Sequence, residues 1–188
     1  MIYTFCGGFA IAASMAYATS GPFILQKTLH LTPLVFGWMG IFVGVGNIVA
    51  KVLSPTLIKK YSMEKILCSG LICILLSGTI LILVYLFLPL TVTLVMLVVM
   101  LSLFGQGLSG ANAVALGVSP YRHIGGAANA LWTFIQMGLC FLVSFYLSLP
   151  IFKFDQVTGL SSAYLLIGVL TLGAYTLYRF CRIHEKIK

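Results

Sequence analysis

The residues best suited to bind a ligand lie on one predicted helix in the last third of the chain. Asn129, Thr133 and Gln136 are spaced i, i+4 and i+7, so at about 100° per residue they share one narrow helix face. Uncharged polar groups beside small residues suit a water-accessible cavity for an amphipathic ligand. The same groups can instead form hydrogen bonds between membrane helices, at about 0.6 kcal/mol each. The sequence leaves both interpretations open.

Two further predicted helices carry polar residues beside small ones. One side of the first holds Tyr3, Gly7, Ala10, Ser14 and Tyr17. One side of another holds Gln106, Ser109, Gly110, Ala113 and Gly117. We expect Tyr17 and Gln106 to line a substrate site together with the three residues above. Small residues at spacings of three or four, as at Gly40 and Gly44, also predict close approach of neighbouring helices.

A serine near glycine suggests a second chemistry. Ser109 lies in Gly107-Leu108-Ser109-Gly110, and His123 precedes two glycines, which resembles rhomboid intramembrane serine proteases. A nucleophile and its base must lie about 3 Å apart. Ser109 lies ten residues before Ser119, where a loop begins, and is therefore about 15 Å deep, whereas His123 sits in that loop. We expect no enzyme activity and no catalytic residue.

No pattern in the sequence predicts a metal site or a cofactor. The five cysteines are odd in number and form no C-x-x-C or Cys/His spacing, so we interpret them as small residues of membrane helices. The three acids, Glu64, Asp155 and Glu185, all fall outside the predicted spans. Acids within a membrane usually mark proton relays, and none is expected here.

Composition decides the class of protein. Of the 188 residues, 61% are hydrophobic and only 7% are charged, whereas soluble domains carry roughly 25% charged residues. Runs of about 20 apolar residues predict membrane-spanning helices. Proline and glycine at the boundaries separate six such runs, at about 2–19, 33–53, 66–88, 91–118, 124–149 and 162–180. We therefore predict a single all-α transmembrane domain over 1–188.

Nine of the eleven lysines and arginines fall on one side of this six-span arrangement. They are Lys51, Lys59, Lys60, Lys65, Arg122, Arg179, Arg182, Lys186 and Lys188, and the exceptions are Lys27 and Lys153. Positive residues in short loops stay in the cytoplasm. Both termini are therefore predicted to be cytoplasmic, and the net charge of +8 is a topology signal that does not indicate nucleic-acid binding.

Three segments resemble the Bcr/CflA family of drug-efflux transporters, which belongs to the major facilitator superfamily. The most specific is 119–136, which reads SPYRHIGGAANALWTFIQ and resembles the loop and eleventh helix of that family. Gly21-Pro-Phe-Ile-Leu-Gln26 with Thr32-Pro33 resembles its connection between the seventh and eighth helices. Asn47 and the segment 57–62, with Lys65 beyond, resemble the second copy of the superfamily's loop motif, although Ser62 and Met63 depart from it.

The resemblance implies a carboxy-terminal half, helices seven to twelve, of a proton-coupled multidrug antiporter in the bacterial inner membrane. Its substrate would be a small hydrophobic or amphipathic molecule, and its partner would be a six-helix amino-terminal half or a parallel homodimer. The family's proton-coupling acid lies in the first half, outside this chain. Lys59, Lys60, Lys65 and Arg122 would anchor and gate the cytoplasmic loops. The alternative is a truncated or split-gene remnant without activity alone.

Overall fold

The computed structural model describes residues 2–152 and 155–185, and the side chains of all of these except Arg122 and residues 179–185. The described residues form helices and connecting turns and contain no strand. The six long helices are α1 (Ile2–Pro22), α2 (Pro33–Ile58), α3 (Met63–Phe87), α4 (Val92–Val118), α5 (Gly125–Leu147) and α6 (Gln156–Glu185). Three short ones are η1 (Phe23–Thr28), η2 (Ser119–Ile124) and η3 (Pro150–Phe152).

Six of the described helices are long and apolar enough to cross a membrane, so the predicted number of long apolar helices is confirmed. Two predicted ends are wrong. The helical backbone of α1 continues through Pro22 into η1, a π-helix, and α2 continues through Pro55 to Ile58. Proline removes one donor, but membrane helices tolerate it when local π-type turns satisfy the freed backbone groups, or when it lies in the last turn.

The start of α6 also differs from the prediction. This helix begins at Gln156, whereas the hydrophobic pattern predicted a start near Ser162. The Asp155 carboxylate accepts hydrogen bonds from the Thr158 backbone N–H at 3.1 Å and from the Thr158 hydroxyl at 2.5 Å. These bonds cap the helix in the manner of an N-cap residue. The cap therefore starts the helix in a polar segment that hydrophobicity alone does not mark.

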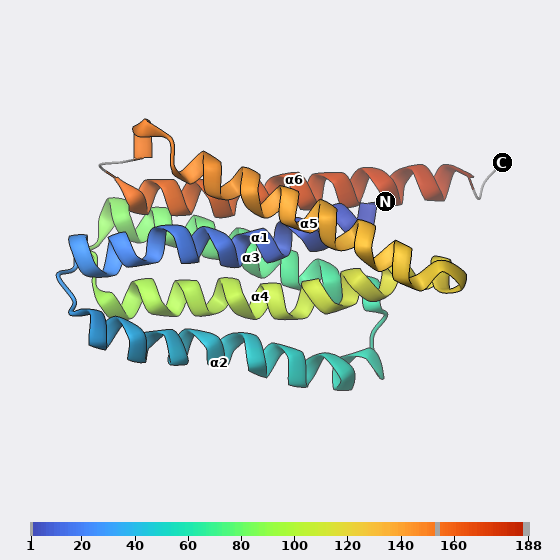
Figure 1. Cartoon of the computed structure of the whole chain (residues 1–188), viewed down its shortest axis with the longest axis horizontal. Coiled ribbons are helices and arrows are strands. Elements are labelled where there is room, and N and C mark those ends of the chain that lie inside the picture. Colours follow the sequence, from blue (N-terminus) through green and yellow to red (C-terminus); the bar gives the residue numbers. More distant parts are fainter. Residues whose placement is uncertain (1, 153–154, 186–188) are drawn as a thin grey trace.

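Successive helices run in alternating directions, so α1 begins and α6 ends at the same end of the bundle (Figure 1). That end also holds the α2–α3 and α4–α5 connections. We call it the basic end, because exposed Lys59, Lys60 and Lys65 lie there. The other end holds η1, the α3–α4 connection and the α5–α6 connection, and we call it the opposite end.

Helices that are adjacent in sequence seldom pack together. The extensive contacts are those between α3 and α4, α3 and α6, α2 and α4, α1 and α5, α1 and α4, and α1 and α6. If α1 is exchanged with α4, α2 with α5, and α3 with α6, the same set of helix pairs results. The first three helices and the last three therefore make equivalent contacts. Because α1 and α4 run in opposite directions, the bundle consists of two interlocked three-helix units of inverted orientation (Figure 1).

Small residues form the central helix crossings. A Cβ atom on Gly70 of α3 would lie 2.5 Å from the carbonyl oxygen of Gly105 on α4. A Cβ atom on Gly7 of α1 would lie 2.5 Å from the Cβ of Ala113 on α4. The predicted close approach at Gly40 and Gly44 of α2 is wrong for this structure, because a Cβ there would meet nothing within 4 Å.

Helices α2 and α5 are the most exposed of the six. Each packs extensively against one helix only, α2 against α4 and α5 against α1. In their most apolar windows, 17% of α2 and 28% of α5 are buried, against 44% or more in the other four spans. Large apolar side chains such as Phe42 and Phe134 are therefore exposed. In a membrane these faces contact lipid or another protein.

Candidate functional site

The predicted polar stripe on α5 lies beside the α1 contact. Asn129 and Thr133 are exposed, and the Thr133 hydroxyl donates to the Asn129 carbonyl oxygen of its own helix at 2.9 Å. Gln136 is half-buried, and its Cα lies 3.6 Å from the position of a Cβ on Gly8 of α1. The stripe therefore faces outward at its start and meets α1 at Gln136.

Gln106 is paired with α2. The Asn47 side-chain amide donates to Gln106 Oε1, and also to the Leu103 carbonyl oxygen at 3.0 Å. This bond joins α2 to α4 through two half-buried amides within the span. Asn47 was noted in the sequence for its resemblance to a loop motif, and its partner could not be predicted, because nothing in the local pattern links positions 59 residues apart.

Tyr17 is half-buried, and its ring packs over Gly21. The Tyr17 hydroxyl is buried without a hydrogen-bond partner among the described residues. No hydrogen bond in the described part of the chain links Tyr17 or Gln106 to the α5 stripe. The predicted substrate residues thus lie on three helices, and within the described part of the chain no hydrogen bond joins them to one another across the helices.

The predicted cytoplasmic loop residues gather at the basic end. Lys59 and Lys60 follow the last turn of α2, Lys65 lies in the first turn of α3, and all three are exposed. The backbone of Arg122 lies in η2 at the same end, and its side chain lies outside the described residues. Lys51, on α2, is exposed as well. Lys153 and the basic tail residues lie outside the described side chains.

One acid belongs to a span, contrary to the sequence-based expectation. Helix α3 begins at Met63, so Glu64 lies in its first turn. The Tyr3 hydroxyl of α1 donates to Glu64 Oε1 at 2.5 Å, and the Tyr3 ring contacts Tyr178 of α6 edge-on at 5.7 Å. This cluster joins three helices at the basic end. The sequence pattern missed it because hydrophobicity places the start of α3 at Ile66.

Ser109 and His123 occupy different environments. Ser109 is fully buried in α4, where its hydroxyl donates to the Gly105 carbonyl oxygen at 2.8 Å. His123 is exposed in η2. The described residues contain no group of three or more His, Cys, Asp or Glu residues that could hold a metal ion.

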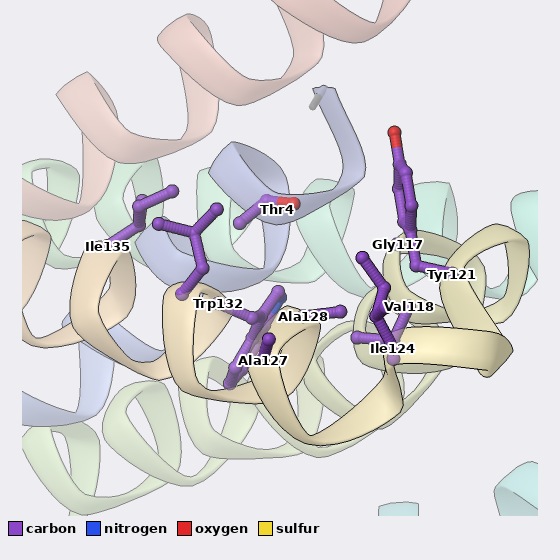
Figure 2. A pocket seen from close by; sticks show the side chains of 10 residues that line it. Thr4, Gly117, Val118, Tyr121, Ile124, Ala127, Ala128, Trp132 and Ile135 are labelled. Carbon is purple, nitrogen blue, oxygen red and sulfur yellow. The ribbon is translucent and has the colours of Figure 1, made fainter.

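A cavity of about 290 Å³ lies at the basic end between α1, α4, η2 and α5 (Figure 2). Its lining is mostly apolar and includes Thr4, Ala128, Leu131, Trp132 and Ile135. None of the predicted substrate residues lines it. Asn129, Thr133 and Gln136 fall on the opposite flank of α5 from Leu131 and Ile135, because 100° per residue separates the two sets on either side of Trp132.

Trp132 separates these two surfaces. Its side chain is buried against α1, where Cζ2 lies 3.4 Å from a Cβ position on Gly7, and Cδ1 lies 3.9 Å from one on Gly117 of α4. The indole N–H has no partner among the described residues.

Comparison of the sequence with models of known protein families and with curated proteins finds no match.

Proposed function

We propose that this chain is a six-helix half of a small-molecule exporter of the major facilitator type. The observation that carries the proposal is the interlocking of two inverted three-helix units, whose contact set is unchanged by exchanging α1–α3 with α4–α6. Inverted three-helix repeats nested within each half are typical of major facilitator transporters. The resemblance of segment 119–136 to the Bcr/CflA family supports the same assignment and suggests the carboxy-terminal half, in a bacterial inner membrane.

The charge distribution supports an orientation. Lys59, Lys60 and Lys65 lie at the basic end, and Lys27 lies at the opposite end. Positive residues next to spans favour the cytoplasm. We therefore place the basic end, with both chain termini, in the cytoplasm. In this orientation Lys59, Lys60, Lys65 and Arg122 belong to the cytoplasmic loops.

The exposed faces of α2 and α5 supply the surface for a second half. Because each packs extensively against one helix only, both leave one side free for a partner. The partner is a complementary six-helix half, or a second copy in parallel orientation. Asn129, Thr133, Gln136, Gln106 and Tyr17 are our proposed substrate contacts, and transport would proceed by rocking of two halves around a site between them.

Proton coupling is assigned to the partner. An antiporter needs a group that titrates within the membrane. Within the six described spans the one acid is Glu64, at the very start of α3 and bonded to Tyr3. A group at the edge of the membrane and engaged with a tyrosine is poorly placed to bind proton and substrate in turn. We expect the chain alone to give no proton-driven drug resistance.

Expression in an efflux-deficient bacterium tests the proposal. The chain would be expressed alone and together with an acid-bearing amino-terminal half, and resistance to hydrophobic drugs would be measured. We expect resistance only on co-expression, abolished by an uncoupler and by Asn129→Leu combined with Gln136→Leu. A matched control is Leu83→Met, at an exposed position of α3 outside the proposed partner surface, which should leave resistance unchanged.

Two outcomes would contradict parts of the proposal. Uncoupler-sensitive resistance from the chain alone would show that coupling does not need a partner acid. No resistance with any complementary half would favour an inactive remnant.

The protease alternative has no support in the geometry, because the Ser109 hydroxyl bonds to its own helix and His123 is exposed in η2.

A further inference from the structure

A second cavity, of about 530 Å³, lies at the opposite end between α1, η1, α5 and α6. We call it the Lys27 groove. Its size falls within the range of roughly 300–1,000 Å³ that is typical of small-molecule sites. Its described lining includes a charged side chain, and several of the lining residues are polar: Thr19, Lys27, Thr28, Ser148 and Gln156.

The π-helix η1 builds one wall of this groove. Phe23, Lys27 and Thr28 all line it, and they are the first, fifth and sixth residues of η1. The wide π turn, with bonds from i to i+5, places residues at these spacings on one side. Lys27 Nζ lies 4.9 Å from the centroid of the Phe23 ring. π-helical turns are frequent at functional sites, and here the turn holds a cation beside an exposed aromatic ring.

The hydrogen-bond donors of the groove are only partly used. The hydroxyls of Thr19 and Ser148 donate to carbonyl oxygens of their own helices, each at 2.9 Å. The Gln156 amide donates to the Phe152 carbonyl oxygen at 2.8 Å, which uses one of its two N–H groups. Among the described residues, Lys27 and Thr28 make no side-chain hydrogen bond. Within the described part of the chain, the Lys27 ammonium, the Thr28 hydroxyl and one Gln156 amide N–H are therefore available to a ligand.

The described residues that line the groove include no carboxylate. The acid nearest in sequence to a lining residue is Asp155, which precedes Gln156. Both of its carboxylate oxygens accept hydrogen bonds from Thr158 at the start of α6. Free donors together with a positive charge and no lining acid favour an anion over a cation. The Phe23 ring and the buried Leu147 add an apolar surface to the same cavity.

We propose that the Lys27 groove binds a small aromatic carboxylate. The carboxylate contacts the Lys27 ammonium, with Thr28 and Gln156 as further donors, and the ring lies against Phe23. Binding itself does not depend on the proposed transport function. The further role of the groove, as the place where an exporter releases its substrate on the outer side, rests on the proposed transport function. In that role the groove would restrict the substrates of the exporter to organic anions.

Equilibrium binding to the full chain tests the proposal directly. The purified protein would be placed in phosphatidylcholine nanodiscs at pH 7 and titrated with 2-naphthoate and with its neutral analogue 2-naphthamide. We expect naphthoate to bind at least about tenfold more tightly, the scale of a charge-assisted hydrogen bond. Lys27→Met should remove this preference, Lys27→Arg should retain it, and Thr28→Val should weaken it.

The matched control is Lys51→Met, an exposed lysine on α2 that does not line the groove. It should leave the preference unchanged, which separates a local contact from general attraction to a positive protein. Equal binding of naphthoate and naphthamide would overturn the proposal, and so would a preference that survives Lys27→Met or is lost in Lys51→Met. The assay involves no gradient, so naphthoate binding without drug resistance would reject the exporter and keep the site.

Discussion

At the residue scale, single glycines determine how closely the helices approach. Gly70 and Gly105 bring α3 and α4 into backbone contact, because a Cβ on either would lie 2.5 Å from the other's carbonyl oxygen. Lipid provides no hydrophobic force between helices, so such contacts are the main source of association. Gly40 of α2 has open space around it instead. The same residue type therefore has opposite structural roles at these positions.

We expect Gly105→Ala to destabilise the bundle by about 1–3 kcal/mol, the usual cost of overpacking. Thermal unfolding in detergent, followed with a thiol-reactive dye, would report it, because Cys6 is fully buried in the folded protein. Gly40→Ala is the control and should be neutral or slightly stabilising, since alanine is the better helix former. Equal effects of the two variants would refute the close α3–α4 crossing at Gly105.

Asp155 couples the start of α6 to pH. Burial raises the pKa of its carboxyl, but hydrogen bonds from the Thr158 hydroxyl and N–H, the Tyr85 hydroxyl and the Val157 N–H together outweigh burial, so the pKa lies below its ordinary value of 3.8. A depressed pKa contributes stability that is present above the unfolded-state pKa and is lost as pH falls through the folded-state value. We expect stability to decrease below about pH 4.

Unfolding measured between pH 6 and pH 3 would check this. Asp155→Asn should keep the cap, because asparagine caps helices equally well, and should remove this pH dependence. Asp155→Ala should lose about 1 kcal/mol at pH 6. If Asp155→Asn retained the full acid dependence, the cap would not be its source.

At the scale of elements, the order of packing differs from the order of the chain. Helix α2 packs against α4 and hardly touches α3, its successor in sequence. The contact includes the amide pair of Asn47 and Gln106, and the approach of Gly107 to Ala50, where a Cβ on the glycine would lie 2.7 Å from the alanine Cβ. Polar side-chain pairs and close small-residue contacts thus join α2 to α4.

Cysteine cross-linking tests this neighbour relation. In a background without native cysteines, Asn47→Cys with Gln106→Cys should be joined readily by a short bifunctional maleimide, because the two native side chains already contact each other. Ala50→Cys with Ala130→Cys, on exposed α5, should not. Cross-linking of the second pair at a similar rate would place α2 beside α5 and contradict the described packing.

At the scale of the whole molecule, the charge distribution gives the bundle two chemically different ends. The basic end holds exposed Lys59, Lys60 and Lys65, whereas Lys27 lines a groove at the opposite end. A polar face on each side of the membrane is required of any multi-pass protein, and the asymmetry in positive charge orients it. The proposed exporter would take up its substrate on the basic side and release it on the other.

Membrane-impermeant thiol labelling of intact cells tests this orientation. In a cysteine-free background, Lys27→Cys should react from outside, and Lys59→Cys should react only after the membrane is permeabilised. Both positions are exposed, so a difference in reactivity reports sidedness. Labelling of Lys59→Cys in intact cells would reverse the proposed orientation.

The sequence alone was sufficient to predict the all-helical class and the number of long apolar helices. These follow from local composition, since a run of about 20 apolar residues must be helical in lipid wherever it packs. The prediction that helices end before Pro22 and Pro55 was wrong. Whether a proline ends a helix depends on whether the neighbouring backbone groups can form other hydrogen bonds.

Only the tertiary structure decided which polar groups meet. Gln106 bonds Asn47 of α2 across 59 residues, and Tyr3 bonds Glu64 across 61 residues. The Lys27 groove combines residues from η1, α5 and α6 that no periodic pattern relates. Helix periodicity determines the face of a helix on which a residue lies. It does not determine which other helix packs against that face, because this depends on where small residues allow two helices to approach closely.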